Sequence, residues 1–173
     1  YASSTPATDG ELVYVAFLQS DGGTTPALNV GAARPATLGK VVVAAYDFAG
    51  RRQWLQQVGE FASVHGFCSC PVLYNDMVIL NGDHDGESYV AALNRSSGET
   101  VWKVPRKHKI RSYCTPIIRE VAGRTQMVLT GSQRVISLDP QTGDQHWVVE
   151  GPTEQFVSSM VFDGSKFYMT AGF

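Results

Sequence analysis

Charged residues are scarce in this chain of 173 residues: Asp, Glu, Lys and Arg make up 17%, and the net charge is −2. Without a basic excess there is no electrostatic reason to expect nucleic acid or an anionic membrane surface as a partner. Long apolar runs are also missing, since none approaches the roughly 20 residues that a membrane-spanning helix needs. The start at Tyr1 shows no charged segment followed by an apolar one, so we expect a soluble chain whose leader is already trimmed.

Cysteine is scarce as well, with three residues, Cys68, Cys70 and Cys114. An odd number in a chain of this length excludes a disulfide framework as the basis of the fold and settles no cellular compartment. The chain has 17 Gly, 8 Pro and 43% hydrophobic residues instead. This composition is typical of many short strands joined by tight turns, and it predicts an all-β protein.

An internal repeat is the main feature of the sequence. Its three tryptophans are spaced roughly 45 to 48 residues apart, and each stands four residues after a glycine. The pairs are Gly50 and Trp54, Gly98 and Trp102, and Gly143 and Trp147. An Asp or Asn precedes each glycine, so the repeated element reads Asx…Gly-x-x-x-Trp.

Further patterns precede each Asx…Gly-x-x-x-Trp element. A small residue and a proline, which is tolerated at the first position of a strand, open each unit at Thr5-Pro6, Cys70-Pro71 and Thr115-Pro116. Two apolar runs follow in each unit. They are residues 12–16 and 42–46, 77–80 and 89–93, and 127–130 and 135–138. Each unit therefore reads as four strands.

The Asx…Gly-x-x-x-Trp element has a clear physical role. An Asx side chain caps backbone N–H groups of a β-turn in which glycine takes a positive φ. The tryptophan on the fourth strand offers a large flat apolar surface with one N–H, which suits docking against a neighbouring sheet.

We therefore expect Trp102→Ala to lower the free energy of unfolding by about 3 to 5 kcal/mol, as other large core truncations do. A loss under about 1 kcal/mol in urea denaturation contradicts the docking role.

This repeated unit resembles the tryptophan-docking motif of quinoprotein-like (PQQ-like) propellers. That group spans PQQ-dependent alcohol dehydrogenases and the propeller lipoprotein of the bacterial outer-membrane assembly complex. Residues 65–71 and 151–156 are similar to uncharacterised PQQ-like repeat proteins of planctomycete-type bacteria, which bring no assigned activity. The resemblance implies a β-propeller of four-stranded antiparallel blades and an extracytoplasmic location, periplasmic or secreted.

The repeat divides the chain into about 3.5 blades of a single partial propeller. The units are 1–60 with an insertion at 19–40, 61–107, 108–152, and a half-blade at 153–173. Propellers close with typically 4 to 8 blades, so this number does not close a ring. We expect a fragment of a ring of roughly 6 to 8 blades. The remaining blades of the same polypeptide, or a second copy, then cover the two ends.

In a four-stranded blade, the loops that return to the next blade and the loops between strands two and three lie on one face. We call it the loop face; the insertion 19–40 is predicted to be one of its loops. Because binding residues usually lie in loops on a rigid scaffold, we predict that it binds a protein, peptide or carbohydrate. For a ligand-facing residue such as His84, we expect mutation to Ala to leave stability nearly unchanged. The candidate residues are His65, Cys68, Cys70, Asp83, His84, Asp85, His108, Arg111, Tyr113 and Cys114.

Three other interpretations of the loop face remain open. His65, Cys68, His84 and His108 are residue types that ligate metals, although the Cys-x-Cys spacing is not that of structural zinc sites. Cys70 and Cys114, each beside a proline, form either a disulfide or buried thiols. The basic run at residues 106–111 is either an anion site or a solvated loop.

The main rival function is that of a quinoprotein-type or metal-dependent oxidoreductase. The resembling enzymes hold the quinone between a tryptophan floor and a disulfide of adjacent cysteines, beside calcium and an aspartate base. This chain has no Cys-Cys pair, and the docking motif accounts for all three tryptophans. There is no Gly-x-Ser-x-Gly motif of a hydrolase either. We therefore predict no catalytic residues and no cofactor, and a binding or scaffold role.

Overall fold

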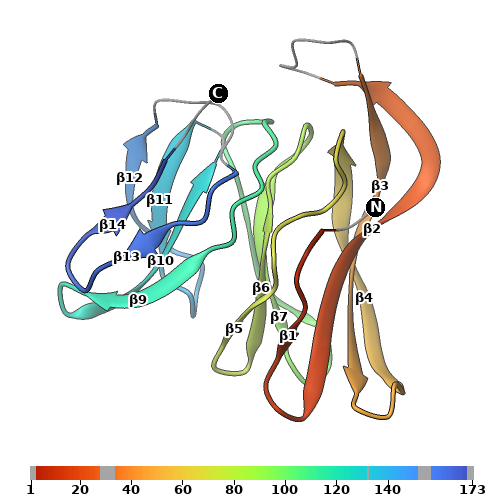
Figure 1. The fold of residues 1–173 in the computed structure, drawn as a ribbon, viewed down its shortest axis with the longest axis horizontal. Coiled ribbons are helices and arrows are strands. Elements are labelled where there is room, and N and C mark those ends of the chain that lie inside the picture. The colour runs from red at the N-terminus through yellow and green to blue at the C-terminus, as the bar shows by residue number, and fades with distance from the viewer. Residues whose placement is uncertain (1–2, 28–33, 132, 152–156, 171–173) are drawn as a thin grey trace.

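The computed structural model describes residues 3–27, 34–131, 133–151 and 157–170. Within these ranges the chain forms strands, turns and loops, arranged as three four-stranded antiparallel sheets and one two-stranded sheet. The first three sheets stand side by side in chain order, and the two-stranded sheet overlaps the third in this view (Figure 1). This confirms the prediction of an all-β chain built from four-stranded antiparallel blades. No helix in the described ranges is long and apolar enough to cross a membrane.

Strands follow one another within each sheet, in the order of the chain. The first sheet holds β1 (Ala7–Thr8), β2 (Leu12–Pro26), β3 (Pro35–Asp47) and β4 (Arg52–Ser63). The second holds β5 (Val72–Tyr74), β6 (Met77–Gly82), β7 (Tyr89–Asn94) and β8 (Thr100–Pro105). The third holds β9 (Ile117–Val121), β10 (Arg124–Gly131), β11 (Arg134–Leu138) and β12 (Gln145–Glu150), and the fourth holds β13 (Val161–Phe162) and β14 (Phe167–Tyr168).

Two apolar cores lie between successive sheets, and β6 contributes to both. Its side chains alternate: Val78 and Leu80 join the core shared with the first sheet, while Met77 and Ile79 join the core shared with the third sheet. A strand that is buried on both faces needs no polar alternation. The continuous apolar run at residues 77–80 is explained by this position in the middle of the stack.

The predicted insertion at residues 19–40 is not a loop where the structure describes it. Strands β2 and β3 continue through it as a paired hairpin, with Gln19 opposite Lys40 and Thr25 opposite Ala36. A register shift falls between Ser20 and Thr24, so the extension contains a β-bulge. The prediction of a loop was wrong at Gly39, because this glycine allows the two strands to pair closely. A Cβ on Gly39 would lie 2.1 Å from the Gln19 carbonyl oxygen. Residues 28–33 lie outside the described ranges.

The turns between the third and fourth strands have the predicted geometry. Gly50, Gly98 and Gly143 have φ angles of 78°, 78° and 81°. In the first and second sheets, Asp47 Oδ1 accepts hydrogen bonds from the backbone N–H groups of residues 49 and 51, and Asn94 Oδ1 from those of 96 and 97. Asp139 caps the N–H of residue 141 in the same way. Each turn therefore combines an Asx cap with a glycine of positive φ. The first turn is shorter, since the Gly50 N–H donates to the carbonyl of Asp47, three positions before it, whereas Gly98 and Gly143 donate to carbonyls four positions before them.

Candidate functional site

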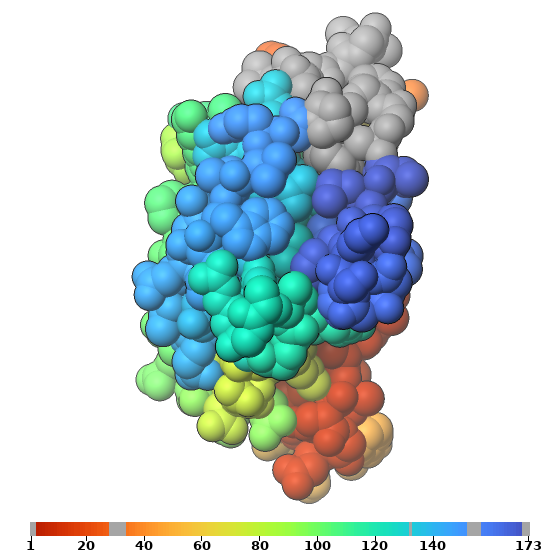
Figure 2. Space-filling view, turned by 90° about the vertical axis from the view of Figure 1, so that its left-hand side faces the viewer, coloured from red at the N-terminus to blue at the C-terminus, as the bar shows by residue number. Residues whose placement is uncertain are grey.

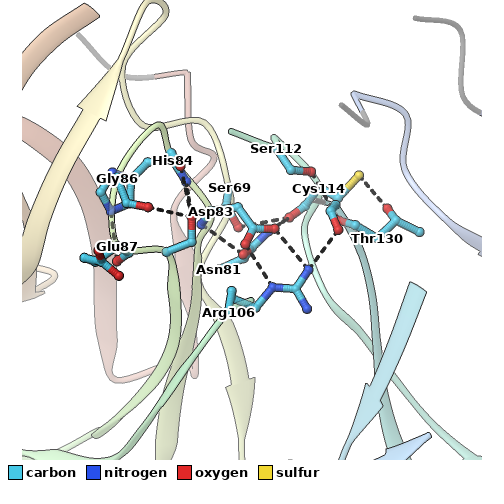
Figure 3. A network of polar contacts seen from close by, with 12 residues as sticks. Ser69, Asn81, Asp83, His84, Gly86, Glu87, Arg106, Ser112, Cys114 and Thr130 are labelled. Atoms are coloured by element: carbon cyan, nitrogen blue, oxygen red, sulfur yellow. Dashed lines mark hydrogen bonds and ion pairs between the residues drawn. The ribbon is translucent and has the colours of Figure 1, made fainter. Parts of the chain in front are cut away.

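The loop face brings three segments into contact: residues 62–70 after β4, 83–88 between β6 and β7, and 106–114 after β8. The backbone N–H of Asp85 donates to the Ala62 carbonyl at 3.1 Å, and the N–H of Arg106 donates to the Ser88 carbonyl at 2.8 Å. Candidates that are far apart in the sequence therefore share one region (Figure 3). Arg111 and Asp85 point toward one another, and His65 packs against Tyr113.

Arg106 and Asp83 form a buried ion pair at the centre of this region. Arg106 Nε lies 2.9 Å from Asp83 Oδ1, and the two side chains are 4% and 0% exposed. Arg106 Nη2 also donates to Asp83 Oδ2 at 3.3 Å and to the Gly131 carbonyl at 3.0 Å, at the end of β10 (Figure 3). The pair thus joins the second sheet to the third. Arg106 was not among the predicted site residues.

A second buried pair joins the same two loops. Arg111 Nη1 lies 2.6 Å from Asp85 Oδ2, and both side chains are 2% exposed. A third pair, Lys109 with Glu87, lies on the surface. The loop 83–87 therefore presents carboxylates at alternate positions to the basic run 106–111. The alternation of carboxylates at positions 83, 85 and 87 was visible in the sequence, but the basic residue that pairs with each of them was not.

The basic run fits neither of the two interpretations that the sequence left open. Two of its arginines are buried and paired with carboxylates. Lys107 and Lys109 are exposed. Two of the four positive charges of the run are therefore neutralised inside the loop face, and the two lysines are displayed to solvent.

His84 is buried, with 3% of its surface exposed. Its Nδ1 accepts a hydrogen bond from the Ala62 N–H at 3.1 Å, and its Nε2 lies 3.1 Å from the Glu87 carbonyl oxygen. This arrangement assigns the proton to Nε2. The ring stacks on Phe61 at 4.9 Å, and burial lowers the His84 pKa. Both nitrogens are engaged, so the expectation that His84→Ala leaves stability unchanged does not fit this position.

All three cysteines are free thiols in the structure. Cys114 is buried; its Sγ accepts from Thr130 Oγ1 at 2.8 Å, and burial raises its pKa. Cys70 Sγ accepts from the Thr5 N–H at 3.2 Å. Burial alone would raise the Cys70 pKa, but hydrogen bonds from Thr115, Thr5 and Ser4 lower it. Of the two alternatives, the structure therefore contains separate thiols, each hydrogen-bonded to a neighbouring unit or strand.

The four potential metal ligands predicted from sequence do not converge. Among the described residues, no group of three or more His, Cys, Asp or Glu side chains is placed to hold a metal ion. His65 is exposed and packs edge-on against Tyr113 at 5.9 Å. Cys68 Sγ lies near the His65 carbonyl, while His108 lines a separate cavity of about 470 Å³ between β8 and the third sheet.

A ladder of hydrogen bonds joins the first strands of successive units. Ser4 Oγ donates to the Ser69 carbonyl at 2.9 Å, Ser69 Oγ to the Cys114 carbonyl at 3.3 Å, and Cys114 Sγ to the Ser158 carbonyl at 3.2 Å. Each donor stands two residues before the proline of its unit, in the segment that precedes the first strand. Cys114 therefore takes the place of a serine in this ladder. Sequence reasoning noted the small residues beside the prolines but not this role.

Two tryptophans contact the turn of the following unit. Trp54 Nε1 donates to the Arg95 carbonyl at 2.9 Å, and a Cβ on Gly98 would lie 2.6 Å from the Trp54 ring. Trp102 Nε1 donates to the Pro140 carbonyl at 3.3 Å, and its ring lies against the next turn glycine in the same way. Trp147 differs, since its Nε1 donates to Gln126 Oε1 of its own sheet at 2.7 Å.

The residues present do not fit a quinone cofactor. Two tryptophans are used between the sheets, and Trp147 lies on β12. The carboxylates Asp83 and Asp85 are both committed to arginines. Neither a free aromatic floor nor an open carboxylate faces a shared space among the described residues of the loop face, so we derive no step through such a group.

A family model and one solved structure agree with the observed fold. The family model described as outer membrane protein assembly factor BamB matches residues 2–166. The crystal structure of BamB from Moraxella catarrhalis is 16% identical with a TM-score of 0.52, and the match covers 94% of this chain and 52% of that one. Quinohemoprotein alcohol dehydrogenase from Comamonas testosteroni is 18% identical with a TM-score of 0.48, over 86% of this chain and 25% of that one. The chain thus spans about half the length of the BamB structure. No curated protein matches it.

Proposed function

Because the chain belongs to the family of the outer membrane protein assembly factor BamB, we propose that it is a non-catalytic propeller scaffold whose loop face holds a protein partner. The proposed location is outside the cytoplasm, and the proposed partner is a component of an outer membrane protein assembly system. Residues 152–156, which carry part of the resemblance to planctomycete-type proteins, lie outside the described ranges.

One observation carries this proposal: the polar side chains of the loop face are buried and paired with one another. The pairs of Arg106 with Asp83 and of Arg111 with Asp85 join the loops 83–88 and 106–114, and Arg106 also reaches the end of β10. A surface that is already rigid loses little conformational entropy when a partner binds. Pre-organised loops on a rigid scaffold are therefore suited to recognition.

The exposed side chains around these pairs support a protein as the partner. His65, Glu87, Lys107 and Lys109 are exposed, and they carry both signs of charge. Charged groups at the rim of an interface act mainly on the rate and specificity of protein association. The buried carboxylates Asp83 and Asp85 are already paired with arginines, which supports the proposed non-catalytic role.

A binding measurement tests the proposal. The double variant K107E/K109E reverses the exposed positive charge of the loop face, and it should weaken binding to a purified outer membrane protein assembly component by about tenfold. Arg124→Glu, an exposed arginine at the start of β10, is the matched control and should change affinity less than about twofold.

Two results would overturn the proposal. One is an equal loss of affinity in the control and the loop-face variant, which would remove the loop face as the binding surface. The other is a stoichiometric metal or a quinone absorption band in the purified protein together with oxidation of an alcohol, which would favour the oxidoreductase alternative.

A further inference from the structure

The extended hairpin of the first sheet lies beside the loop between β6 and β7. We call residues 19–26 of β2 and 35–40 of β3 the hairpin arm; its β3 strand pairs with the end of β4. A cavity of about 390 Å³ separates the arm and the end of β4 from the loop 83–88. Figure 2 shows the face formed by the third and fourth sheets, whereas this cavity lies at the other end of the stack, between the first sheet and the second.

The end of β4 is bound to the loop 83–88 through both backbone polar groups of one residue, Ala62. Its carbonyl accepts from the Asp85 N–H at 3.1 Å, and its N–H donates to His84 Nδ1 at 3.1 Å. Ala62 stands opposite Leu38 of the hairpin arm. An imidazole nitrogen accepts a hydrogen bond only while it carries no proton. The neutral form of His84 therefore connects the loop to β4 and, through β4, to the arm.

The backbone of His84 is held separately from its ring. The His84 N–H donates to Ser88 Oγ at 3.0 Å, and this hydroxyl donates back to the His84 carbonyl at 2.9 Å. The ring stacks on Phe61 and lies under Gly86, where a Cβ would be 2.5 Å from His84 Cε1 (Figure 3). Because the backbone is fixed by Ser88, the ring can turn about its side-chain bonds while the loop stays folded.

The cavity beside the His84 ring is acidic. Among the described residues that line it, none is Lys or Arg. The arginines and the lysine of the loop 106–114 are engaged with the three carboxylates of the loop 83–88. The ionisable groups that face the ring come from four elements: Asp21 of the arm, Glu60 of β4, Asp83, Asp85 and Glu87 of its own loop, and Tyr89 of β7. The buried position thus suits the neutral ring, and the cavity suits the protonated ring.

We propose that His84 is a pH-sensitive switch that connects the loop 83–88 to the hairpin arm when neutral and releases it when protonated. The protonated ring gives up the Ala62 N–H and turns into the cavity, toward the carboxylates of Asp21, Glu60 and Glu87. This proposal is independent of the partner proposed for the loop face.

The direction of the switch follows from the two environments of the ring. Burial lowers the pKa of His84 in the closed position, whereas a ring among carboxylates at the cavity rim binds a proton more readily. The open state therefore binds more protons than the closed state. Between the two pKa values, the ratio of open to closed molecules rises by up to about tenfold for each unit of pH decrease. Opening begins as the pH falls below the ordinary imidazole value of about 6.5.

An NMR titration of the isotope-labelled chain tests the switch. As the pH is lowered from about 7.5 to about 4.5, the Ala62 amide proton should shift upfield because its hydrogen bond is lost. This shift should have the same midpoint as the titration of the His84 ring nitrogens, below about pH 6.5. The amides of β6 should keep their folded positions through that midpoint, because the opening is local.

Two matched variants identify the residue responsible. The side-chain oxygen of His84→Asn can take the place of Nδ1 as an acceptor that does not titrate. This variant should retain the Ala62 hydrogen bond and lose the pH-dependent shift. His65→Asn changes an exposed histidine of the same face and should keep the wild-type shift.

Three results overturn the proposal. The first is a His84 ring that stays neutral until the β6 amides lose their folded positions, since His84 then titrates only through global unfolding. The second is an Ala62 amide that does not shift when the ring is protonated. The third is an equal shift in the wild type and in His84→Asn. If His84→Asn fails to fold, the wild-type titration decides alone, because the ring, Ala62 and β6 are observed in the same sample.

Discussion

Buried charges on the loop face occur as neutral pairs, and each pair links segments from different sheets or loops. Arg106 reaches both Asp83 and the end of β10, so one side chain joins the second sheet to the third. A buried charge is tolerated in a protein when it is paired and hydrogen-bonded. Removing one member leaves the other buried without compensation, and this cost is large compared with that of a surface pair.

Arg106→Met therefore tests the buried pair. It should lower the free energy of unfolding by about 3 to 5 kcal/mol, because Asp83 remains buried without its partner. The matched control is Lys109→Met in the same loop, whose exposed pair with Glu87 should contribute less than about 1 kcal/mol. Urea denaturation of both variants measures the difference, and similar losses would show that burial does not set the cost here.

His84 should make stability depend on pH. Burial lowers its pKa in the folded state, while in the unfolded chain it protonates near its ordinary value of about 6.5. As the pH falls below that value, the unfolded state binds a proton that the folded state does not, so stability falls. The contribution is fully present above about pH 6.5 and is lost toward the lower folded pKa.

The variants His84→Gln and His65→Gln separate this effect from general acid sensitivity. Denaturation between about pH 5.5 and 7.5 should show a smaller slope of stability against pH for His84→Gln than for the wild type. His65 is exposed, so His65→Gln should keep the wild-type slope. An unchanged slope in the His84 variant would remove this residue as the cause.

At the scale of single residues, the sequence predicted which residue types lie near one another on the loop face, but not the direction in which their side chains point. Asp83, His84 and Asp85 were recognised as unusual, and they do lie beside the basic run. Their side chains point inward, because their partners come from residues more than 20 positions away, as with Arg106 and Asp83. Pairing at such separation is set by the packing of the sheets and is not encoded in the local pattern. Whether the exposed candidates bind a partner remains a prediction.

At the scale of the element, the turn between the third and fourth strands connects one sheet to the tryptophan of the sheet before it. The turn chemistry was predictable, since an Asx cap and a glycine with positive φ are local properties. The hairpin at 19–40 was not, because its glycines were interpreted as loop signals. One of them, Gly39, permits close pairing with β2, a contact between strands that composition does not reveal.

Gly98→Ala and Gly50→Ala form a matched pair that measures the tryptophan contact. Both glycines have φ of 78°, so both variants should lose about 1 to 2 kcal/mol from the left-handed conformation. Only Gly98 lies against a tryptophan, Trp54, so its variant should lose about 1 to 3 kcal/mol more through overpacking. Chemical denaturation gives both values, and equal losses would contradict a tight contact at Gly98.

At the scale of the molecule, the second sheet lies between two apolar cores and the fourth sheet is at the periphery. All six residues of β6 are buried, whereas β13 and β14 are two residues each and partly exposed. Local stability follows burial and contact density. The succession of sheets was therefore predictable from the repeat. The sheets differ in local stability because some have neighbouring sheets on both sides and others do not.

Amide hydrogen exchange measures this gradient directly. The amides of β6 and β7 should exchange slowest, at rates set by global unfolding, and those of β13 and β14 should exchange fastest among the strands. Exchange of β13 as slow as that of β6 would mean that the fourth sheet is covered in solution. In that case the measurement should be repeated on Trp147→Ala to identify the covering contact.

The hydrogen-bond ladder and the tryptophan contacts also affect how such repeat proteins can evolve by duplication of their units. The second unit carries a donor for the next unit and an acceptor for the previous one, as Ser69 does with Cys114 and Ser4, and the third unit does the same through Cys114. An in-frame duplication of one whole unit, about 45 residues, would therefore insert a new blade that matches its neighbours on both sides without further mutation. A duplication whose length is not a whole number of repeats would separate a donor from its acceptor, so the gain or loss of blades should proceed in whole repeats.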